Sequence, residues 1–145
     1  MPGCVFRASG DVFEPDEFLA RSVLDACNVF RKGEPRGKAS IWNSSGFVVE
    51  VSAASGQELD KQIRDAVEFL TVNREDIVRL SGCTGFSDMR LDFGINRRNG
   101  FLQCSFLPPQ LLELAGALKV GIEISIYGEE SHRNRTSAWR GLAGE

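Results

Sequence analysis

The stretch at residues 88–95, "DMRLDFGI", decides the predicted fold because its apolar and polar side chains alternate. Residues two apart on a β-strand lie on the same face of a sheet, so this stretch predicts a strand with one buried and one wet face. The apolar set is Met89, Leu91, Phe93 and Ile95, and the polar set is Asp88, Arg90 and Asp92.

Downstream, residues 100–107, "GFLQCSFL", repeat the alternation after "NRRN", whose asparagines and following glycine suit a hairpin loop. We therefore predict a second antiparallel strand beside the first, with Leu102, Cys104 and Phe106 on its core side. "PPQLLELAGALKV" (108–120) predicts a helix entered through proline. "GIEISIYG" (121–128) predicts a final strand with Ile122, Ile124 and Ile126 toward the helices.

Upstream, the pattern predicts two strands and two helices. The strands are the one in "CVFRASGDVF" (4–13), which ends at Gly10–Asp11, and "GFVVEVSA" (46–53). The helices are "EPDEFLARSVLDAC" (14–27) and "SGQELDKQIRDAVEFLTV" (55–72). In the second helix Ser55 and Glu58 have capping-box spacing, and we expect Leu59, Ile63 and Leu70 to be buried against the sheet. "DIVRLSGCTGF" (76–86) reads as a connection with a short strand at "IVRL".

This order predicts an α+β fold with a mainly antiparallel sheet and helices packed on one face, an elaborated ferredoxin-like arrangement. The chain has 145 residues, 42% hydrophobic and 26% charged, which fits a single domain with its own core. We place that domain at residues 1–128. Residues 129–145 are polar and unpatterned and include His132, so we expect a flexible C-terminal tail.

Several motifs that would indicate a membrane protein, a secreted protein or a metal site are not found in the sequence. The apolar runs are too short to span a bilayer, and the first residues lack the order of a secretory signal, so we expect a cytoplasmic protein. The 4 cysteines form no CxxC and have no histidine cluster beside them. Free thiols are therefore expected, with no disulfide framework, no metal site and no cofactor.

The solvent-exposed polar face of the predicted sheet is our first candidate site. Its predicted partner-binding residues are Glu50, Asp88, Arg90, Asp92, Glu123 and Tyr127, and Ser52 is expected on the same face. Carboxylates outnumber arginines there, and the whole chain has a net charge of -3. We interpret this face as a docking surface for a basic protein partner, with an ordinary solvated sheet face as the alternative.

The basic stretch "NVFRKGEPRGKASIW" (28–42) is the second candidate site. Arg31, Lys32, Arg36 and Lys38 would contact an anion such as a phosphate backbone, with Trp42 as a stacking surface. The next element reads as a strand and no GxxxxGK[ST] is present, so a nucleotide cradle is not predicted. The alternative is a solvated connection in which Trp42 anchors the start of a strand.

No catalytic residues are predicted. Asp88 and Asp92 are about 13 Å apart along a strand, too far to share a proton. Asp92 beside Glu123 on a neighbouring strand stays open as a pair. The only histidine lies in the expected tail, so neither a Ser-His-Asp nor a Cys-His relay has a placed base. A small enzyme is our third interpretation, after protein recognition and nucleic-acid binding.

Four stretches resemble the bacterial domain of unknown function 4279 family. They are "ASGDVFEPDEFL" (8–19), "FRKGEPRGKASIW" (30–42), "LDKQIRDAVEFL" (59–70) and "LPPQLLELAGALKVGIEISIYG" (107–128). The resemblance covers residues 4–128 and departs at "IWNSSG", where the family has a longer polar segment. It implies small bacterial cytosolic proteins without an established activity, some with immunity roles, and it supplies no catalytic residues. We therefore expect an immunity-like binding module for a basic partner such as a nuclease toxin, and we leave a homo-oligomer open.

Overall fold

The computed structural model describes residues 3–128, which contain one five-stranded sheet in the order β2-β5-β1-β6-β7. The strands are β1 (Cys4–Gly10), β2 (Ala26–Phe30), β5 (Ser45–Ser52), β6 (Phe86–Asn96) and β7 (Gly121–Tyr127). Neighbouring strands are antiparallel except β6 and β7, which run parallel. The predicted α+β class with a mainly antiparallel sheet is confirmed.

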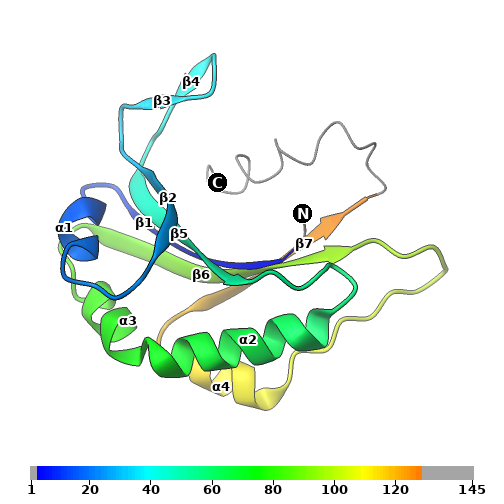
Figure 1. Ribbon diagram of the computed structural model, residues 1–145. Helices are drawn as coiled ribbons and strands as arrows, with labels where there is room; N and C mark the ends of the chain where they lie inside the picture. The colour runs from blue at the N-terminus through cyan, green and yellow to red at the C-terminus, as the bar shows by residue number, and fades with distance from the viewer. Residues whose placement is uncertain (1–2, 129–145) are drawn as a thin grey trace.

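Helices cover one face of this sheet. They are α1 (Pro15–Leu19), α2 (Leu59–Val72), α3 (Arg74–Ser81) and α4 (Pro109–Ala117). In Figure 1, α2, α3 and α4 lie beneath the sheet, while the small hairpin of β3 (Pro35–Arg36) and β4 (Ser40–Ile41) stands on the opposite side. The core lies between sheet and helices; its largest fully buried apolar side chains include Phe6, Phe47, Phe93, Leu70, Ile77 and Leu91.

The long helix is confirmed, with a later start than predicted. Ile63 and Leu70 are buried as expected, whereas Leu59 is only partly buried against the core. The Ser55 N–H donates to Glu58 Oε1 over 3.3 Å, which is half of a capping box. The Ser55 hydroxyl instead accepts from the Gln57 N–H, so residues 55–58 form a turn and α2 begins after it.

The predicted helix at 14–27 is wrong in its second half. Here α1 ends at Leu19, and the chain then runs past α3 before it enters β2. The Ser22 hydroxyl and the Val23 N–H both donate to Asp76 Oδ2, over 2.6 and 3.0 Å. These tertiary bonds, together with pairing of β2 along β5, outweigh the local helical pattern.

The predicted short strand at "IVRL" is also wrong, because residues 74–81 form α3. Ile77 and Leu80, three residues apart, are both fully buried on one side of that helix. The missed signals were Glu75 and Asp76 in the first turn and Arg79 in the last, which favour a helix through its dipole.

The predicted hairpin partner at 100–107 forms no strand. On its two sides β6 pairs with β1 and with β7, so no edge of β6 is left for it. Met89, Leu91, Phe93 and Ile95 are buried as predicted. In contrast, Leu102, Cys104, Phe106 and Ile126 are exposed, which corrects their predicted core position.

The described chain has no helix with both the length and the apolar content needed to cross a bilayer. The predicted C-terminal tail, with His132, lies outside the described residues.

Candidate functional site

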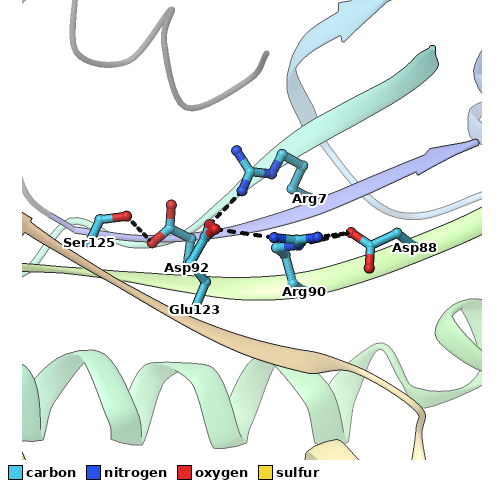
Figure 2. Close-up of polar contacts among 6 residues, drawn as sticks. All are labelled: Arg7, Asp88, Arg90, Asp92, Glu123 and Ser125. Carbon is cyan, nitrogen blue, oxygen red and sulfur yellow. Dashed lines mark hydrogen bonds and ion pairs between the residues drawn. The ribbon is translucent and has the colours of Figure 1, made fainter. Parts of the chain in front are cut away.

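A cluster of charged side chains lies on the sheet face that carries no helix. It consists of Arg7 on β1, Asp88, Arg90 and Asp92 on β6, and Glu123 and Ser125 on β7, and we call these six residues the charged cluster. Figure 2 shows them on the side of the sheet away from α2. Alternation along three adjacent strands brings them together, since every member stands on the face opposite the apolar core residues.

Glu123 holds two arginines in this cluster. Its Oε2 accepts from Arg7 Nη2 over 2.7 Å, and its Oε1 accepts from Arg90 Nη1 over 3.1 Å. Arg7 and Arg90 are directly opposite each other across β1 and β6, an arrangement that destabilises a sheet when like charges are unscreened. The carboxylate between them removes that penalty.

Arg90 is held at its other end by Asp88. Arg90 Nε and Nη2 both contact Asp88 Oδ2, over 2.8 and 2.7 Å. The hydrogen bond from Arg90 to Asp88, ahead of the charges of Asp88 and Glu123, raises the pKa of Arg90 although burial opposes this. The accessible charges of the cluster are therefore fixed in position by their neighbours.

Asp92 lies beneath these ion pairs with 2% of its surface exposed. The Ser125 hydroxyl donates to Asp92 Oδ1 over 2.7 Å, while Asp92 Oδ2 is buried without a hydrogen-bond partner among the described residues. Arg7, 4% exposed, has the same feature at Nη1. Burial raises the pKa of Asp92 and the Glu123 charge adds to this, against the Ser125 bond and the two arginines.

The predicted partner-binding residues do share one face, with two corrections. Glu50 is exposed, and Asp88, Arg90 and Glu123 are partly exposed, but Asp92 is buried rather than solvent-facing. Ser52, expected on the same face, lies on the helix side after a register shift in the β1–β5 pairing, where its hydroxyl donates to Asp65 over 2.6 Å. Tyr127 ends β7, half-buried, and its carbonyl accepts from the Arg97 N–H.

The residues of the predicted anion site do not all have the same surroundings in the structure. Trp42 stacks on Phe30 with ring centroids 4.4 Å apart, and the Arg36 guanidinium lies 5.1 Å from the Trp42 ring centre. Trp42 and Phe30 pack with Val5 and Val48 in a small apolar cluster on the helix-free face. Trp42 and the charged cluster thus belong to one surface, a placement that the sequence analysis did not predict.

The side chains of Arg31 and Lys32 are engaged by acidic residues near the start of the chain. Arg31 makes two 2.7 Å hydrogen bonds to Asp16 of α1, and Lys32 pairs with Asp11. The Arg31 hydrogen bond lowers the pKa of Asp16. Lys38 is exposed in the β3–β4 turn, whose glycine at 37 has a φ of 68° that favours glycine. Arg31 and Lys32 are thus each paired with an acidic side chain, and the anion site stays a prediction.

Arg7, the most buried cation of the site, is not among the residues predicted from the sequence. Its signal was available in "CVFRASG", where Arg7 stands between Phe6 and Ala8 and so has the parity of the polar face. Its contact with Glu123, 116 positions away in the chain, could not be derived from that parity.

A hollow of about 450 Å³ lies between α1 and α3, lined by residues that include Phe13, Phe18, Arg21 and Arg79. Arg79 is already engaged by Asp76, by the Arg21 carbonyl and by the Phe18 ring. No three histidine, cysteine or acidic residues within 3–128 are arranged to hold a metal ion.

Fold and site together define a small α+β module with a helix-backed sheet whose other face carries a network of paired charges. The family model described as a domain of unknown function, DUF4279, matches residues 2–129, and the chain belongs to this family. No curated protein and no solved structure matches the chain.

Proposed function

We propose that the protein is a non-catalytic binding module that docks a basic protein partner on the helix-free face of its sheet. The observation that carries this is the charged cluster, whose accessible carboxylates Asp88 and Glu123 are fixed by Arg90 and by the buried Arg7. Side chains that are already ordered lose little conformational freedom on binding, which favours specific recognition.

The charge of this face supports a basic partner. The four carboxylates Glu50, Asp88, Asp92 and Glu123 outnumber the three arginines Arg7, Arg36 and Arg90 of this face by one. Glu50 and Asp88 lie at the accessible margins, where they would steer a cationic surface during encounter. A protein partner is also supported by Trp42 and Arg36 on the same surface, since Trp and Arg are enriched among residues that dominate binding energy.

The immunity-like role belongs to this proposal, with a nuclease toxin as the kind of basic partner that fits the charge. Nucleic-acid binding through residues 31–38 is the second candidate. It receives less support because Arg31 and Lys32 are paired with acidic side chains and would have to leave them.

The test is quantitative affinity capture from cells that express the chain, using wild type and two charge-matched double variants. Glu50→Gln with Asp88→Asn removes two carboxylates from the face, and Glu68→Gln with Glu113→Gln removes two exposed carboxylates from helices on the other side. We expect the first variant to lose the specific partner and the second to retain it.

Association kinetics with the recovered protein then give the sharper measurement. The face variant is expected to associate about tenfold more slowly at low ionic strength, with the difference shrinking as salt screens the charges. Equal association rates for wild type and the face variant at low ionic strength, or equal losses in both variants, would contradict the proposal.

A further inference from the structure

The segment at residues 97–108 projects from the end of β6 and returns to α4, and we call it the arm (Figure 1). Three of its large apolar side chains are exposed: Phe101 is fully exposed, Leu102 is 76% exposed and Phe106 is 73% exposed, whereas Leu107 is partly buried against the core. Single exposed apolar residues are common, but several on one short segment mark an interaction surface.

The arm has the sequence of a strand without a strand partner. Residues 100–107 alternate in polarity, yet no backbone–backbone hydrogen bond joins residues 98–107 to any other part of the described chain. Both edges of β6 are occupied by β1 and β7, so the arm cannot enter its own sheet beside β6.

The arm is anchored at its base. Gln103 Nε2 donates to the Asn96 carbonyl over 2.8 Å, and Gln103 Oε1 accepts from the Arg98 N–H over 2.9 Å. With Gln103 turned to the end of β6, its neighbours Leu102 and Cys104 are exposed. The arm is therefore held to the end of β6 through Gln103, while its other side chains between 100 and 106 are exposed.

We propose that the arms of two copies pair as antiparallel strands across a two-fold axis, so that the chain forms a homodimer. The sequence is self-complementary for this pairing: centred on Cys104, Leu102 lies opposite Phe106, and Gln103 lies opposite Ser105. Residues 100–107 carry no charge, so no like charges meet across the axis. Pro108, which has no N–H, ends the pairing segment.

A second copy fits the arm better than the basic partner proposed above, because the arm has no carboxylate to attract such a partner. This inference is independent of the proposed function: the arm and the charged cluster use different residues, and either can fail alone.

The first test measures mass by analytical ultracentrifugation over micromolar to millimolar chain concentrations. Wild type is expected to show a dimer whose fraction rises with concentration. Leu102→Ser with Phe106→Ser is expected to raise the dimer dissociation constant by about tenfold or more. The control is Val72→Ser with Val78→Ser, which changes two exposed apolar residues on α2 and α3 and should leave the constant unchanged. Thermal midpoints confirm that each variant is folded.

The second test locates the contact. Cys4 is buried, so replacing Cys27 and Cys83 by serine leaves Cys104 as the accessible thiol of the chain's 4 cysteines. A short bis-maleimide is expected to link two such chains, and adding Cys104→Ser is expected to abolish the link.

The proposal would be overturned by a wild-type monomer at every concentration, by a dimer that the arm variant leaves intact, or by the lack of a crosslink through Cys104. A monomeric chain that captures a different protein in an arm-dependent way would also overturn it, since the occupant would then not be a second copy.

Discussion

Arg7 and Asp92 are buried side chains that each leave one polar atom without a partner on the described chain. A buried charge costs several kcal/mol of solvation, and its attraction to a partner recovers this only with good geometry. Arg7 recovers part of it through the 2.7 Å bond to Glu123, and Asp92 recovers part of it through Ser125. The two residues therefore tie the position of the accessible charges to the stability of the sheet.

The burial of Asp92 predicts how the free energy of unfolding depends on pH. Because its folded-state pKa is raised by burial, the folded protein binds the Asp92 proton more tightly than the unfolded chain does. Stability from this group is present at low pH and is lost as pH rises from the ordinary aspartate range through the raised pKa. The free energy of unfolding of wild type, relative to that of Asp92→Asn, is thus expected to fall over this window.

Urea unfolding at a series of pH values measures this difference, and the asparagine of the variant keeps a side-chain oxygen for the Ser125 bond. Glu68→Gln, which removes an exposed carboxylate on α2, serves as the control. A wild-type-minus-variant difference that is flat, or that rises with pH, would show that Asp92 does not carry a raised pKa.

Among the helices, α2 contributes the largest set of buried apolar side chains, Ile63, Ala66 and Leu70. Ile63 is buried on it while Val72, at its end, is exposed. Ile63→Ala is expected to lower the free energy of unfolding by about 2–5 kcal/mol through lost apolar burial and a residual cavity. Val72→Ala is expected to cost less than about 0.5 kcal/mol. Denaturant midpoints give both values, and similar small losses for the two variants would contradict the burial of this helix face.

Elements with a long, regular pattern were predictable, because their periodicity is local. The strand at 88–95 and the helix at 59–72 follow from spacing alone. The helix at 14–27 and the strand at 100–107 failed for a different reason: one was redirected by bonds to Asp76, and the other found every β6 edge occupied. Such outcomes depend on neighbours that are distant in sequence.

For the candidate site too, the sequence predicted only what depends on local alternation. Parity placed Asp88, Arg90, Asp92 and Glu123 on a common face, and the structure brings them together (Figure 2). Alternation along a strand shows which face a side chain is on but not how much of it is exposed, so the burial of Asp92 was not predicted. It also does not reveal pairing across strands, so the role of Glu123 between two arginines was missed.

For the whole molecule, charge is distributed so that many cations are engaged. The net charge is -3, and Arg31, Lys32, Arg79 and Arg90 each make an ion pair with a nearby acidic side chain. Polyanions bind surfaces where cations converge without such partners. We therefore expect a cationic partner rather than a nucleic acid.

An oligonucleotide-binding experiment tests whether the basic residues between 31 and 38 recognise nucleic acid. We expect that wild type does not bind oligonucleotides with the steep salt dependence typical of nucleic-acid recognition. Replacing Arg31, Lys32, Arg36 and Lys38 by glutamine should leave the thermal unfolding midpoint nearly unchanged. Fluorescence anisotropy across a salt series gives the first result and thermal unfolding the second. Salt-sensitive binding by wild type that the fourfold variant loses would move nucleic-acid recognition ahead of protein recognition.

The bond between Arg7 and Glu123 also has a consequence for how the chain folds. It joins residues 116 positions apart, on strands that lie either side of β6. Contacts of such long sequence separation require closing a long loop before they contribute to stability. We therefore expect this ion pair to form late in folding, when the two ends of the domain have been brought to the same sheet.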